Sequence, residues 1–228
     1  MDFTSRMVEL LSAVRRERNG AVADAMRCYG RRCGLNYGVS LPTVRALARA
    51  CARDAGFARY LFRQDVRELR LAALHLADPA GLTLAEAEEW GSGIDNSEIA
   101  EEAAFALFSR AAVFAELFPR WVSSENPLLV HTALMAAARR HDAPVDWTVA
   151  AMEALRRHAA DAPLSDPKVR LLAGGAAALL ASVGSRNEEN RQAVLRIAGS
   201  RGEFPAADFI HEELAWRLDV HPSGSTVA

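Results

Sequence analysis

The sequence is short of several features that define common protein classes. Its three cysteines form no CxxC pair and have no matching group of histidines, so the signals for a disulfide framework and for a zinc site are both weak. Buried free thiols are therefore expected at Cys28, Cys33 and Cys51. Aromatic residues make up only 7% of the 228 residues, and the alternation of β-branched residues that is typical of strands is nearly absent.

Other absences bear on function and location. No run of about 18 apolar residues occurs, and the N-terminal region carries charged residues where a signal peptide has an apolar core. We therefore expect a cytoplasmic protein without a membrane segment. A Walker loop, a GxGxxG loop, HExxH, GxSxG and an EF-hand loop are all missing, so neither a metal nor an organic cofactor is expected.

What the chain has in abundance is helix-forming, apolar sequence. Half of the residues are hydrophobic, and Ala, Leu and Arg, which lose little side-chain entropy in a helix, are frequent. The class predicted is all-α, with a single domain over residues 1–220 and a flexible tail over 221–228.

Charge is unevenly distributed along the chain, although the formal net charge is only −2. Residues 1–75 contain 14 Arg against 7 acidic residues, whereas the remainder contains 13 basic against 22 acidic residues. A basic half can attract phosphates, but two solvated helical faces of opposite sign give the same counts. Charge alone leaves both interpretations open.

Apolar periodicity and helix-start signals divide the chain into short helices. Ser40 is suited to cap free amide groups, and Pro42 lacks the N–H that is unbonded in a first helical turn. The predicted helices cover residues 4–18, 21–29, 40–51, 66–76, 83–90, 96–108, 113–122, 126–140, 147–159, 166–182, 187–198 and 205–218. Trp121, Trp147 and Trp216 are expected to cover the core from helix ends.

Small residues recur in mid-helix about 30 to 40 residues apart, near residues 72, 103, 133 and 175. This spacing favours a HEAT-like α-solenoid of antiparallel helix pairs, curved with a concave face, because small residues let helix backbones approach closely. The period is irregular, so an orthogonal helix bundle is the alternative.

Three segments in order resemble the AlkD-like family of DNA alkylation repair proteins. Residues 37–48 are similar to the family pattern GV-x-x-P-x-x-R, and residues 61–74 to LW…E-x-R-x-x-A-L. Residues 94–102 correspond to D-S-W-D-x-x-D. The resemblance spans about residues 21–182. It implies a HEAT-like array that holds duplex DNA and, in active members, a monofunctional glycosylase for N3- or N7-alkylated purines.

The resemblance also assigns site residues. The family's catalytic Asp corresponds to Glu101, with Glu98 as a second carboxylate, and its Trp partner corresponds to Ser97. A carboxylate there stabilises the oxocarbenium character that develops on the sugar. The lesion-contacting Arg corresponds to His131, and the second Trp falls near Gly175.

Further residues are candidates for lesion and phosphate contact. Trp90, seven residues before Ser97, is either a replacement stacking surface or a cover of the core. The DNA-binding candidates are Arg45, Arg67, Arg70, His131, Arg139, Arg140, Lys168 and Arg170.

Two hypotheses of function follow. The first is a DNA-binding, HEAT-like member of the repair family, a divergent glycosylase or a protein that binds DNA without base excision. The second is an α-solenoid scaffold that binds a protein partner, which the acidic sequence after residue 75 favours. The placement of Arg45, Arg49, Arg67, Arg70, Arg139 and Arg170 distinguishes the two, because DNA binding requires them on one concave surface.

Overall fold

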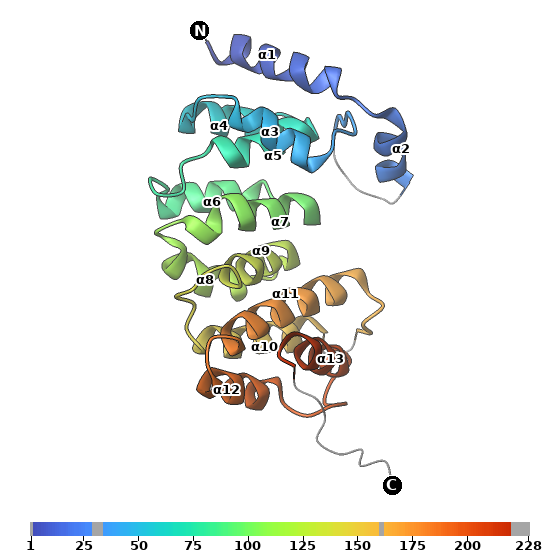
Figure 1. Cartoon of the computed structure of the whole chain (residues 1–228), viewed down its shortest axis with the longest axis vertical. Helices are drawn as coiled ribbons and strands as arrows, with labels where there is room; N and C mark the ends of the chain where they lie inside the picture. The colour runs from blue at the N-terminus through green and yellow to red at the C-terminus, as the bar shows by residue number, and fades with distance from the viewer. Residues whose placement is uncertain (1, 29–33, 160–161, 220–228) are drawn as a thin grey trace. The chain divides into compact units, whose positions relative to one another are not determined.

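The computed structural model describes residues 2–28, 34–159 and 162–219, and within them the chain is all-α (Figure 1). The described residues form thirteen α-helices and one 3-10 helix, with a single isolated β-bridge between Leu35 and Val66. They divide into two compact units, Met1–Phe114 and Ala115–Ala228. The single domain over 1–220 stays a prediction, and the tail over 221–228 lies outside the described residues.

The described residues of unit 1 form seven α-helices and the 3-10 helix. Helix α5 lies at its centre, because it packs against α3, α4 and α7, and nearly all of its residues are buried. The four-residue connection after α4 makes α4 and α5 adjacent, as Figure 1 shows. The elements of unit 1 are α1 (Phe3–Arg16), α2 (Gly20–Cys28), α3 (Leu41–Arg49), α4 (Ala55–Phe62), α5 (Arg67–Leu76), α6 (Leu84–Ser92), α7 (Ser97–Ala106) and η1 (Phe108–Arg110).

Unit 2 is organised around α11, which contacts α9, α10, α12 and α13. Small residues on α11, among them Gly175, Ala176 and Ala177, are buried and allow these close contacts. The helices of unit 2 are α8 (Phe114–Val122), α9 (Pro127–Ala137), α10 (Asp146–Ala159), α11 (Pro167–Gly184), α12 (Glu188–Ala198) and α13 (Ala207–Arg217), with the first residue of α8 assigned to unit 1.

The predicted helices are found within a few residues of their expected ends, with one omission. Ser40 caps α3 by accepting a hydrogen bond from the Thr43 amide, as expected. Helix α4 was not predicted, although Asp54 caps it and its Phe57 is buried against the core. Because the helix is short and contains Gly56, its apolar periodicity in the sequence is weak.

The tryptophan and cysteine predictions have mixed outcomes. Trp121 is buried and Trp147 stacks on Phe118, but the expectation for Trp216 is wrong, because 83% of this residue is exposed on α13. Cys51 is a free, half-buried thiol, and burial raises its pKa. Cys33 and the side chain of Cys28 lie outside the described residues. Within the described part, no helix combines the length and apolarity needed to cross a bilayer.

Candidate nucleic-acid interface

The segments 37–48, 61–74 and 94–102 come together inside unit 1, where Glu68 fixes the loop before α3. Its two carboxylate oxygens accept hydrogen bonds from the amides of Tyr37 and Val39, each at 3.2 Å. Between them Gly38 adopts φ +70°, and a Cβ at this position would lie 2.1 Å from the Asn19 carbonyl oxygen. Glycine is therefore required for the loop to reach the Glu68 carboxylate.

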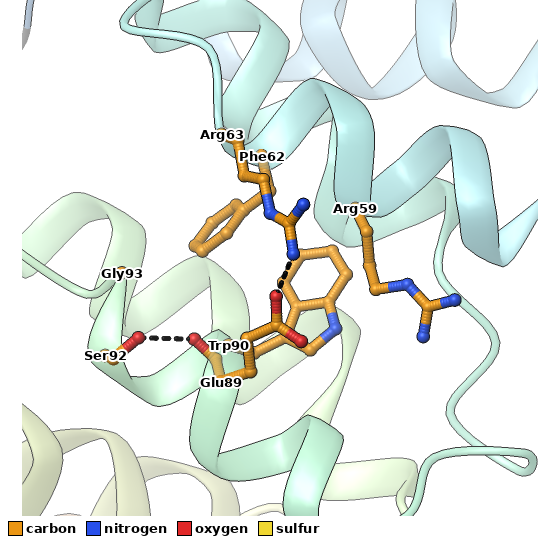
Figure 2. A pocket seen from close by; sticks show the side chains of 7 residues that line it. All are labelled: Arg59, Phe62, Arg63, Glu89, Trp90, Ser92 and Gly93. Carbon is orange, nitrogen blue, oxygen red and sulfur yellow. Dashed lines mark hydrogen bonds and ion pairs between the residues drawn. The ribbon is translucent and has the colours of Figure 1, made fainter.

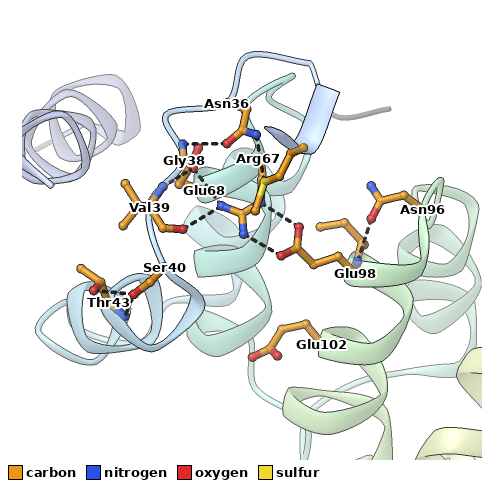
Figure 3. Close-up of polar contacts among 12 residues, drawn as sticks. Asn36, Gly38, Val39, Ser40, Thr43, Arg67, Glu68, Asn96, Glu98 and Glu102 are labelled. Atoms are coloured by element: carbon orange, nitrogen blue, oxygen red, sulfur yellow. Dashed lines mark hydrogen bonds and ion pairs between the residues drawn. The ribbon is translucent and has the colours of Figure 1, made fainter. Parts of the chain in front are cut away.

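Arg67 connects this loop to α7 from a buried position. Its Nη1 donates to the Val39 carbonyl and to Glu68 Oε1, both at 2.9 Å, while Nε and Nη2 donate to the two Glu98 oxygens at 2.7 and 2.6 Å. Figure 3 shows the guanidinium between the loop and Glu98. Burial opposes its charge, but the bonds and charges of Glu98 and Glu68 still raise the pKa of Arg67 above its usual value. Arg67 therefore remains ionised in the interior.

A second ion pair between an arginine and a carboxylate of α7 lies one helical turn after Glu98. Arg45 donates from Nε and Nη2 to the two oxygens of Glu102 at 2.9 and 2.6 Å, and His75 bonds to the same carboxylate. Burial of Glu102 works against its ionisation, yet the hydrogen bonds and charges of His75 and Arg45 prevail and lower its pKa to about 2. The contact with Glu102 likewise raises the pKa of Arg45.

Arg70 makes the third contact, with the connection between α6 and α7. Its Nη1 donates to Asp95 at 2.7 Å, and its Nη2 bonds to the Gly93 carbonyl. Together with Arg67–Glu98 and Arg45–Glu102, this contact joins α3, α5 and α7 through paired charges, a set that we call the charge ladder. Its arginines are already hydrogen-bonded to carboxylates, so a phosphate would have to compete with them.

Because of the charge ladder, two of the three arginines predicted to contact DNA in unit 1 are buried and only one reaches the surface. The Arg67 side chain is only 2% exposed and that of Arg70 is 10% exposed, so both serve to position α7. The Arg45 side chain is 28% exposed and reaches the surface. Sequence reasoning did not identify His75, Asp95 and Glu102 as members of the site. The i, i+4 spacing of Glu98 and Glu102 was the available signal for two carboxylates on one helix face.

The predicted catalytic and lesion-side residues of α7 have different surroundings. Glu98 is held by Arg67, whereas Glu101 is exposed and lies outside the charge ladder. Ser97, the first residue of the helix, is partly exposed, and Asn96 caps the helix by accepting from the Ile99 amide at 3.0 Å. Of the two candidate carboxylates, Glu101 is therefore the one that a bound molecule could approach from solvent.

Trp90 lies on α6 and packs against Phe62 of α4, with ring centroids 4.5 Å apart. It is nearly fully buried, as expected for a residue that covers the core. A pocket of about 170 Å³ adjoins it, and the exposed ion pair between Arg63 and Glu89 lies beside the indole (Figure 2). Ser97 does not line this pocket, so the two lesion-side candidates do not share it.

In unit 2 the structure brings His131 and Gly175 together. His131 is buried on α9, and a Cβ built on Gly175 of α11 would lie 3.1 Å from its Nδ1 and 3.2 Å from the Cβ of Leu134. The space that a tryptophan at residue 175 would need is therefore occupied by these two side chains. The buried His131 is part of the packing between α9 and α11.

The remaining predicted DNA contacts lie on the surface of unit 2. Arg139 is exposed and donates to the Met135 carbonyl at 2.7 Å, while Arg140 forms a two-bond pair with Asp142 at 2.8 and 2.6 Å. Lys168 and Arg170 are exposed in the first turn of α11. Within the described residues, neither side chain makes a hydrogen bond or an ion pair, so both are available to anions.

Comparison with known proteins gives a family and a fold. A family model described as DNA alkylation repair enzyme matches residues 10–193. No curated protein matches the chain. A solved structure is similar with a TM-score of 0.69 and 14% identity over 95% of both chains. It is described as belonging to a new family related to the HEAT-like repeat DNA glycosylases, with affinity for branched DNA structures. This likeness confirms the predicted HEAT-like, all-α fold.

Proposed function

This chain belongs to the DNA alkylation repair enzyme family, and on that premise we propose that it binds DNA, branched DNA included, without releasing alkylated purines. The family supports a nucleic-acid role. The protein of similar fold, described as having affinity for branched DNA structures, supports binding without requiring base excision.

The contact between Gly175 and His131 is the main observation against the release of alkylated purines. A glycosylase that holds a cationic base between aromatic rings needs space for those rings, and at residue 175 the space is filled by His131 and Leu134. The other aromatic position implied by the resemblance is Ser97, which has no ring. Without such rings the alkylated base has no stacking surface at these two positions.

The carboxylates also support loss of the standard chemistry. Glu98 is engaged by Arg67, and Glu101 carries one methylene more than the aspartate that it would replace. Catalytic geometry is sensitive to displacements of about 1 Å, so a longer side chain is a poor substitute at the sugar. If hydrolysis occurs, Glu101 is the residue that would stabilise the sugar cation.

A base-release assay tests the proposal that the protein does not release alkylated purines. The full chain is incubated with duplex DNA carrying 7-methylguanine, beside a Glu101→Gln variant, and the free base is measured. We expect no release from either protein above the spontaneous rate. Release by the wild type that disappears in Glu101→Gln would show that the protein does excise alkylated bases and would identify Glu101 as catalytic.

The salt dependence of binding tests the proposal that the protein binds DNA. Fluorescence anisotropy with duplex and branched DNA from about 50 to about 200 mM salt should show a log-log slope of about −0.9 for each phosphate contacted. A Lys168→Gln, Arg170→Gln double variant should weaken binding and reduce the slope by about two. Arg120→Gln, an exposed cation outside the candidate set, is the matched control. Binding that is absent, or that does not depend on salt, would overturn the proposal.

The protein-interaction scaffold remains the second candidate, and one observation favours it. Trp216 is 83% exposed on α13, and an exposed aromatic ring of this size is common where a partner binds. If DNA binding fails, a Trp216→Ala variant compared with wild type in partner capture from cell extract becomes the test of the scaffold.

A further inference from the structure

Phe105 is an aromatic residue of α7 that the resemblance does not single out. It is partly exposed and lies one helical turn after Glu101. The guanidinium carbons of Arg45 and Arg110 lie over its ring, 4.7 and 5.8 Å from the centroid. Residues of α3, α7 and η1 thus form a small patch of one ring and two cations within unit 1, which we call the Phe105 patch.

The two guanidinium groups of the Phe105 patch differ in their freedom. Arg45 is held by the two bonds to Glu102, so it is fixed in position against the ring. Arg110 is exposed, and in the described part of the chain its side chain makes no hydrogen bond or ion pair beyond its contact with the ring. Its N–H groups are therefore available to an anion, and the side chain can leave the ring without breaking an ion pair.

We propose that the Phe105 patch binds an unpaired nucleotide of branched DNA, with the base against the Phe105 ring and the adjoining phosphate on Arg110. This inference rests on the proposed function and specifies its substrate. An aromatic ring beside a guanidinium is the combination with which proteins bind bases outside a duplex, because every base has a π face for stacking. A base within a continuous duplex is covered by its neighbours and does not offer that face.

The surroundings of the ring fix the orientation of the nucleotide. Glu101 is one turn before Phe105 on the same face of α7, so its carboxylate disfavours a phosphate on that side. Arg110 lies beyond the C-terminal end of the helix and attracts the phosphate there. The patch also places an aromatic ring on α7, the helix in which Ser97 stands at the position of the family's tryptophan.

The experiment compares three DNAs that differ at one nucleotide. The first is a three-way junction with one unpaired 2-aminopurine at the branch, and the second replaces that nucleotide by a tetrahydrofuran abasic site, which keeps the phosphate and removes the base. The third is a continuous duplex of equal length. Binding of the full chain is measured by anisotropy, and stacking is measured by quenching of 2-aminopurine fluorescence.

We expect the wild type to bind the base-containing junction about 5 to 100 times more tightly than the abasic junction, and to quench 2-aminopurine. Phe105→Leu should lose both the preference and the quenching, whereas Phe105→Tyr should keep them. Arg110→Gln should weaken binding to both junctions and reduce the salt slope by about one. Arg53→Gln removes an exposed cation outside the Phe105 patch and should bind as the wild type does.

Equal affinity of the wild type for the base-containing and abasic junctions, with binding still dependent on salt, would overturn this inference and leave the proposed function standing. Absence of binding to all three DNAs would overturn both. A preference that persists in Phe105→Leu would also reject the Phe105 patch. Thermal unfolding of each variant shows whether the fold is intact, and Arg110→Gln tests the patch through a surface position that does not contribute to the core.

Discussion

The two units hold their central helices in different ways. In unit 1, α5 and α7 are joined by the charge ladder, with Arg67 and Glu68 almost fully buried. In unit 2, α9 and α11 meet through small residues, and Gly175 lets His131 and Leu134 approach the α11 backbone. The comparison shows that the segments on which the resemblance was based carry the internal charges of unit 1, whereas Gly175, which the resemblance aligns with a base-holding residue, is part of the packing in unit 2.

The largest expected effect comes from breaking the ladder at its most buried cation. Arg67→Ala leaves Glu68 without its interior partner and releases Glu98, and an unpaired buried charge costs about 3 to 5 kcal/mol. We expect a loss of this size in the free energy of unfolding, measured by urea denaturation. The control is Arg63→Ala, which breaks the exposed pair with Glu89 and should cost at most about 1 kcal/mol. Equal costs would show that the ladder does not stabilise unit 1.

The second effect is a pH dependence of stability that arises from Glu102 in unit 1. The pKa of Glu102 is about 2 in the folded protein against an ordinary 4.5, so its contribution is fully present above about pH 4.5 and is lost as the pH falls toward 2. The loss should amount to at most about 3 kcal/mol. Because other carboxylates titrate in the same range, the measurement is the difference between wild type and Glu102→Gln from about pH 5 to about pH 2. A constant difference would mean that Arg45 and His75 do not hold the carboxylate ionised.

The features that could be predicted from the sequence were those whose signal lies within a few neighbouring residues. The cap at Ser40 was predictable because a capping side chain lies within three residues of the amide that it bonds. Helix α4 was missed because eight residues with an internal glycine carry little periodic signal, and packing on α5 supplies the rest. The family resemblance was confirmed because it rested on ordered segments that are each contiguous.

The candidate site was less predictable, because its members come from distant segments. Arg67 was named for phosphate contact, yet its bonds reach 31 residues along the chain to Glu98, and nothing local indicates that it is buried. His75 and Arg45 meet at Glu102 only after α3, α5 and α7 have packed. Trp216 is a different case, because its place near a helix end predicted that it covers the core, whereas the structure leaves it 83% exposed.

The smallest expected effect tests the packing of unit 2 with two adjacent glycines. Gly174→Ala meets nothing within 4 Å and should stabilise α11 by about 1 kcal/mol, because alanine favours the helix. Gly175→Ala gains the same propensity but presses on His131 and Leu134, and such overpacking costs about 1 to 3 kcal/mol. The difference in unfolding free energy between the two variants isolates the contact, since helix propensity is common to both. If Gly175→Ala is as stable as Gly174→Ala, the α9 and α11 contact can yield. The close contact at residue 175 would then no longer support the absence of base excision, which would rest on Ser97 and on the surroundings of Glu98 and Glu101 alone.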